Sequence, residues 1–147
     1  MTTAQPQIPV SIQQLAQLVQ QMQQMGEYLP PFEAVLTAEN VAFVRDGATD
    51  LAHKLHNMWQ SCLTSVGPDG TAPNPLECKD LRHDLRNNVA VVRGFSDLMM
   101  MDVPEGHQIT PVLDHLRVLS DQFVQVLDAV KAELEVDGEN EAAAMFA

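Results

Sequence analysis

Hydrophobic residues recur every three or four positions along four long segments, which is the spacing of an amphipathic helix. Breaks rich in proline and glycine separate these segments, around residues 26–31, 67–75 and 104–106. We find no stretch with the two-residue alternation of a strand and no internal repeat. The pattern predicts an all-α fold.

The first predicted helix follows a flexible lead over residues 1–10. It begins with Ser11 as its N-cap and ends at Gly26. The second helix begins at Pro31 or at a Thr37 cap. Its apolar seam advances mostly in alternating steps of three and four, which is typical of a helical bundle. The seam comprises Val41, Val44, Ala48, Leu51, Leu55, Met58, Cys62 and Val66.

The last two helices are predicted to form an antiparallel hairpin. One runs from about Glu77 to Val103, and the other begins near Pro111 after a turn at residues 104–106. We divide the chain into the lead, an N-terminal helical region (11–66), a Pro/Gly linker (67–76), the hairpin (77–136) and a frayed acidic tail (137–147).

A lone hairpin has too few layers to bury the apolar stripes of both its helices. We therefore expect two copies to pair into a four-helix bundle as a homodimer, braced by the two preceding helices. The alternative is a monomeric bundle of the four helices of one chain.

The 147 residues carry 8 Lys and Arg against 20 Asp and Glu, a net charge of −12. This charge repels phosphate backbones and anionic lipids, so we expect neither a nucleic-acid partner nor a membrane partner. The N-terminus lacks the features of a signal peptide, so we expect a cytoplasmic protein.

No metal site is expected. His53 and His56 lack further metal ligands that would converge on them from other helices, and the spacing of Cys62 and Cys78 is not that of a zinc or redox motif.

The most informative segment runs from Leu81 to Phe95. At about 100° per residue, Leu85 and Val92 fall opposite His83, which therefore faces outward when the helix packs through them. The outward face also carries Asn87, Ala90, Gly94 and, near its edge, Asp97. Glycine inside a helix costs roughly 1 kcal/mol relative to alanine. We interpret Ala90, Gly94 and Asp97 as a docking surface that another protein approaches closely.

An outward imidazole can act as a nucleophile, because its neutral form has an unprotonated ring nitrogen near neutral pH. Asp84, the next residue, can hold the ring tautomer or accept its proton. Arg86 can balance the charge of a transferred phosphoryl group. With Asn87 one helical turn on, these four residues are the candidate catalytic set.

The sequence His83-Asp84-Leu85-Arg86-Asn87, followed by Gly94 to Leu98, resembles the H-box of the dimerisation and phosphoacceptor domain of sensor histidine kinases. The family pattern is His, an acidic residue, any residue, Arg, Thr or Asn, Pro and Leu, with Gly and an acidic residue about three turns on. His83, Asp84, Arg86, Asn87, Gly94 and Asp97 match it. The segment is also similar to the sporulation-type phosphotransferases, which keep this hairpin without being kinases. The resemblance covers residues 77–135, the hairpin only.

The resemblance implies a histidine-containing phosphotransfer protein of two-component signalling. A phosphoryl group would pass between His83 and an aspartate of a response-regulator receiver domain. Mg²⁺ would belong to the receiver, with no cofactor on this chain, and an upstream histidine kinase is a second candidate partner.

Two departures from the family matter. Asn88 stands at the Pro position, and the sequence has no Gly-rich ATP lid or nucleotide-binding box, so we expect no autokinase activity from this chain alone. The alternative function is a non-catalytic dimerisation or sensor-coupling module derived from a histidine kinase, as the front part of a longer signalling protein.

Overall fold

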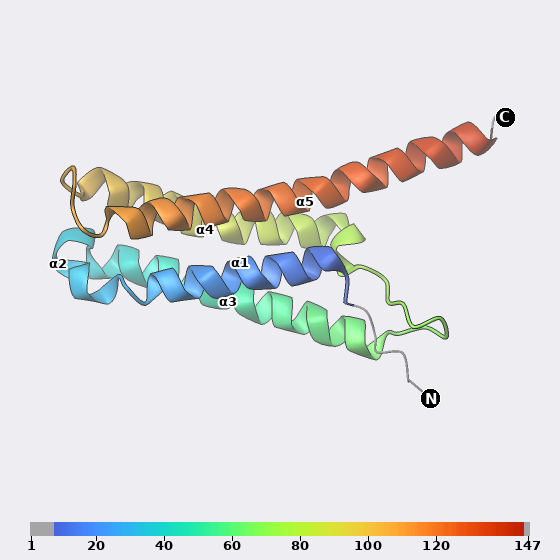
Figure 1. Cartoon of the computed structure of the whole chain (residues 1–147), viewed down its shortest axis with the longest axis horizontal. Helices are drawn as coiled ribbons and strands as arrows, with labels where there is room; N and C mark the ends of the chain where they lie inside the picture. Colours follow the sequence, from blue (N-terminus) through green and yellow to red (C-terminus); the bar gives the residue numbers. More distant parts are fainter. Residues whose placement is uncertain (1–7, 146–147) are drawn as a thin grey trace.

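The computed structural model describes the backbone of residues 8–145 and the side chains of residues 8–138, and every regular element in that range is a helix. The long helices are α1 (Val10–Gly26), α3 (Ala38–Thr64), α4 (Lys79–Asp102) and α5 (Thr110–Met145) (Figure 1). The short elements are α2 (Glu33–Leu36) and 3-10 turns at Pro30–Phe32 and Pro75–Glu77. The all-α prediction is confirmed.

The four long helices form a bundle in which each one packs against two neighbours. α1 contacts α3 and α5, and α4 contacts the same two helices, so α1 and α4 lie diagonally opposite each other. Figure 1 shows α4 and α5 as an antiparallel pair stacked on the antiparallel pair of α1 and α3. The predicted hairpin of the last two helices is therefore present within a four-helix bundle.

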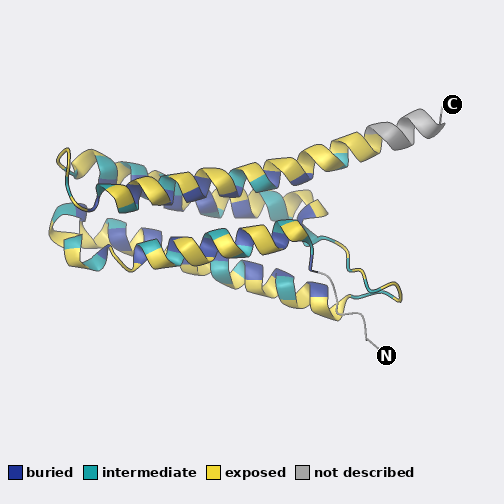
Figure 2. Cartoon of the chain, viewed as in Figure 1, coloured by how far each residue is buried: buried dark blue, intermediate teal, exposed yellow. Residues whose placement is uncertain are grey.

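One apolar core runs through the bundle, and every long helix contributes to it. Leu15, Leu51, Val92 and Phe123, one from each helix, are fully buried, and Figure 2 shows buried residues along the inward-facing sides. α1 and α3 thus cover the apolar stripes of the α4–α5 hairpin within one chain. A second copy is not needed to bury these stripes, and homodimerisation stays a prediction.

The two ends of the described chain differ from the sequence-based expectation. α1 begins at Val10 after Pro9, so Ser11 is not its N-cap. Ile8 is buried, so the end of the predicted lead packs against the core; residues 1–7 lie outside the described range. α5 continues through Gly138 to Met145, so the backbone of the expected frayed tail is helical up to that residue.

Within the described residues, none of the helices combines the length and apolar character that a membrane span requires.

The start of α3 has a side-chain cap. Thr37 is the N-cap of α3, as predicted, and its side chain accepts a hydrogen bond from the Asn40 amide at 3.4 Å.

The linker between α3 and α4 is attached to the bundle by a hydrogen bond and by a buried side chain. Asn74 donates to the Ser11 hydroxyl at 3.0 Å, and Leu76 is fully buried. The linker therefore fixes where α4 begins.

α3 and α4 approach each other closely at Gly47. A Cβ atom at this position would lie 3.0 Å from Cγ2 of Val92, which is closer than side chains normally pack. The absence of a side chain at Gly47 therefore lets α4 settle against α3 with its Val92 face turned inward. This contact fixes the rotation of α4 about its own axis.

We expect Phe123→Ala to lower the free energy of unfolding by about 3–5 kcal/mol, because it removes a large, fully buried ring from the core. The exposed Val118 provides the control, since Val118→Ala should change stability by no more than about 0.5 kcal/mol. Urea unfolding followed by circular dichroism measures both values. A Phe123→Ala protein that dissociates from dimer to monomer at unchanged stability would show that this ring serves an interface between copies.

Candidate functional site

His83 lies on the second turn of α4 with its side chain exposed to solvent. Leu85 and Val92, which the helical geometry places on the opposite side, are fully buried. The predicted outward orientation of His83 is confirmed. The packing of α4, rather than any contact of the imidazole itself, determines this orientation.

Asp84 faces α3 and forms an ion pair with Lys54 across the two helices. The distance from Lys54 Nζ to the Asp84 carboxylate is 2.7 Å, and both side chains are partly open to solvent. Ion pairs of this kind contribute about 1 kcal/mol or less to stability. The contact therefore does little for folding, but it restrains the carboxylate beside His83. Lys54 was not among the residues singled out in the sequence.

Arg86 lies on the opposite flank of α4 and pairs with Asp128 of α5. Both side chains are exposed, and the planar guanidinium has five N–H donors, so one carboxylate oxygen leaves most of them free. The two ion pairs place Asp84 and Arg86 on different sides of His83, one toward α3 and the other toward α5.

A track of small and polar residues continues from His83 along the exposed face of α4. Asn87, Ala90 and Gly94 are all exposed. A Cβ atom at Gly94 would have no neighbour within 4 Å, so nothing inside the described part of the molecule requires glycine here. Asn88, where the H-box pattern has proline, is half-buried in a helix that continues without interruption.

Asp97 sits at the α5 edge of this face in a cluster of charges. Its carboxylate is 3.2 Å from Arg93 Nε and 2.7 Å from Arg117 Nε of α5. Arg93 also hydrogen-bonds Asp121, which raises the pKa of the Arg93 guanidinium. Asp97 thus links α4 to α5, and a partner would meet it already engaged in ion pairs.

On the α3 side, the exposed face of α4 is apolar, which the sequence analysis did not identify. The rings of Phe43 in α3 and Phe95 in α4 stack with centroids 4.5 Å apart, and Phe43 is 42% exposed. Val91 and Leu98, one helical turn before and after Phe95, are exposed beside them. These four residues form what we call the apolar flank. The three- and four-residue steps between Val91, Phe95 and Leu98 are the signal from which a second apolar stripe on α4 could have been found.

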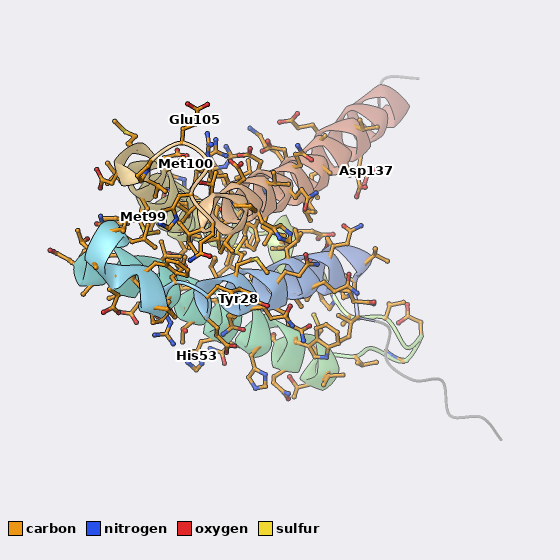
Figure 3. All side chains as sticks on the ribbon, turned by 60° about the vertical axis from the view of Figure 1, so that its left-hand side comes forward. Tyr28, His53, Met99, Met100, Glu105 and Asp137 are labelled. Atoms are coloured by element: carbon orange, nitrogen blue, oxygen red, sulfur yellow. The ribbon has the colours of Figure 1, made fainter. Side chains whose placement is uncertain are left out.

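The remaining histidines lie apart from this face. His53 and His56 are exposed on α3, and Figure 3 shows His53 on the outer surface of that helix. His107 belongs to the turn between α4 and α5, where its Nδ1 accepts a hydrogen bond from the Ile109 amide at 3.1 Å. Among the described residues, no three His, Cys, Asp or Glu side chains are grouped so that they could hold a metal ion.

Comparison with known proteins yields no relative from which a function could be transferred. No protein-family model matches this chain, and no match is found among the curated proteins or the solved structures.

Proposed function

We propose that this protein is a histidine-containing phosphotransfer protein in which His83 exchanges a phosphoryl group with the aspartate of a receiver domain. The observation that carries the proposal is the exposure of His83 on a face whose residues match the H-box in register. A nucleophile that reacts with another protein must be accessible, and the buried stripe of α4 keeps this imidazole at the surface. We place the protein in the cytoplasm, where receiver domains act.

The reaction exchanges one phosphorus bond for another. The unprotonated ring nitrogen of His83 attacks phosphorus, an N–P bond forms, the P–O bond of the aspartyl phosphate breaks, and the aspartate carboxylate leaves. Mg²⁺ chemistry is supplied on the receiver's side. Asp84 stabilises the N–H at the second ring nitrogen, and Lys54 restrains the Asp84 carboxylate at 2.7 Å. An upstream histidine kinase or a phosphorylated receiver provides the phosphoryl group, since this chain is not proposed to be a kinase.

The receiver domain docks over the track and the apolar flank. Gly94 and Ala90 leave space for a close approach, while Phe43 and Leu98 offer exposed apolar area beside them. A contiguous group of exposed apolar side chains is typical of protein-binding surfaces. A partner seated there reaches His83 at the other end of the same helix face.

His83→Gln should abolish phosphate incorporation while leaving helicity unchanged, because the side chain faces solvent. Two phosphoryl donors test this. One is a phosphorylated receiver. The other is phosphoramidate, a small molecule that needs no docking partner and releases ammonia when its P–N bond breaks. Label that is lost in acid and kept in base identifies phosphohistidine. His115→Gln, an exposed histidine on α5, is the matched control and should label like the wild type. If neither donor labels the wild type, the non-catalytic coupling module becomes the better account.

Asp84→Asn should slow transfer by about tenfold or more, because it removes the carboxylate that holds the ring tautomer. Arg86→Ala should slow transfer less, because the guanidinium only balances charge. Neither change should cost more than about 1 kcal/mol of stability, since both residues form exposed ion pairs. Single-turnover transfer rates and urea unfolding measure the two effects. Equal transfer rates for Asp84→Asn and the wild type would show that Asp84 takes no part in the reaction.

Gly94→Leu should slow transfer from a receiver by at least about tenfold by obstructing its approach. The change should raise helix stability by somewhat less than about 1 kcal/mol, because leucine is the better helix former. Ala129→Leu adds similar bulk on the exposed surface of α5 and should leave transfer unchanged. Labelling by phosphoramidate should be similar in both variants, because the small donor needs no docking surface. Unchanged receiver kinetics in Gly94→Leu would place the docking surface elsewhere.

A further inference from the structure

A groove between α4 and α5 adjoins His83 on the side away from the apolar flank. Its volume is about 650 Å³, and four cationic side chains line it: Lys79, Arg82 and Arg86 from α4, and Lys131 from α5. They are half of the eight Lys and Arg residues in a chain whose net charge is −12. The groove is therefore a local concentration of positive charge on an acidic protein.

Two carboxylates also line the groove, and they offset two of its four positive charges. Asp128 pairs with Arg86, and Glu135 lies 3.9 Å from Lys131. Arg82 donates instead to the backbone carbonyls of Leu76 and Glu77, at 2.8 and 2.9 Å. Those neutral acceptors hold the guanidinium in place, and among the described side chains no carboxylate pairs with it.

Folding alone does not favour this arrangement. Lys79 and Arg82 occupy the first turn of α4, where the helix dipole is unfavourable for cations. Arg82 and Arg86 are four residues apart on one helix face, where like charges repel. Each effect is small, but both would be relieved by an anion in the groove.

We propose that this groove binds a phosphoryl dianion next to His83. The inference rests on the proposed function for the identity of that anion, which is the phosphoryl group transferred to and from the imidazole. Lys79 and Arg86 lie four residues before and three residues after His83, so their side chains flank it on one helix face. Lys131 faces them from α5. The groove offsets the repulsion between an acidic protein and a dianion at the one place where the anion must approach.

Binding is measured with inorganic phosphate as the probe, by NMR titration of the wild-type backbone amides at low ionic strength. Shifts should centre on α4 and α5 around the groove, with a dissociation constant on the order of millimolar. Sodium chloride at matched ionic strength should give none of these shifts. Lys79→Gln and Lys131→Gln should each weaken phosphate binding about threefold, and the double variant about tenfold.

Arg45→Gln is the matched control, because it removes the same charge from an exposed position on α3, packed beside Gly26 at the end of α1. It should bind phosphate like the wild type. Equal affinities for the wild type and the double variant, or equal shifts with chloride, would overturn the proposal.

A second measurement separates a site for the transferred group from a site for free phosphate alone. The double variant should be labelled at His83 by phosphoramidate about tenfold more slowly than Arg45→Gln. Phosphate binding in a protein that is never labelled leaves the groove in place as an anion site and refutes the transfer function. Labelling at His83 without phosphate binding, and at equal rates in the two variants, keeps the function and refutes the groove.

Discussion

Burial of one stripe of α4 between α3 and α5 determines everything else about the candidate site. Leu85, Val89, Val92 and Met99 are all buried, and burial of each such side chain contributes about 1.5–3 kcal/mol. Gly47 lets Val92 approach α3 closely and so fixes the rotation of α4. A helix is rigid, so this inward contact holds His83 on the outside without any bond to the imidazole. The packing of the core therefore positions the imidazole and leaves it exposed to solvent.

The exposed face of α4 has two unlike sides. Toward α3 lies the apolar flank, with the stacked rings of Phe43 and Phe95. Toward α5 lie the ion pair of Arg86 with Asp128 and the cationic groove. His83 borders the groove near the N-terminal end of this face. In the proposed reaction the groove would hold the phosphoryl group while a protein partner covers the rest of the face.

The sequence predicted the helices well, because apolar spacing and proline or glycine breaks are local signals. It also predicted the outward orientation of His83, since helical geometry alone places Leu85 and Val92 on the opposite side. It did not show what covers the hairpin: periodicity identifies an apolar stripe but not the helix packed on it. α1 and α3 supply the cover that we had expected from a second copy.

The side-chain contacts between helices could not be predicted from the sequence for a similar reason. The pairing of Lys54 with Asp84, 30 residues away, depends on the relative register of α3 and α4, which only the packed bundle sets. The same holds for Phe43 against Phe95 and for Lys131 opposite Lys79. Ser11 was misassigned as a cap because α1 already begins at Val10, with Pro9 at the N-cap position. The backbone of the expected frayed tail is helical up to Met145, since a single glycine such as Gly138 is tolerated within a helix.

The central claim is that one exposed histidine carries the phosphoryl group. Mass-spectrometric mapping of the phosphorylated protein, digested under basic conditions that preserve the N–P bond, tests it most directly. The account predicts one phosphate per chain, attached to His83. A phosphate on any other histidine, or none after exposure to phosphorylated receivers and to phosphoramidate, would contradict it.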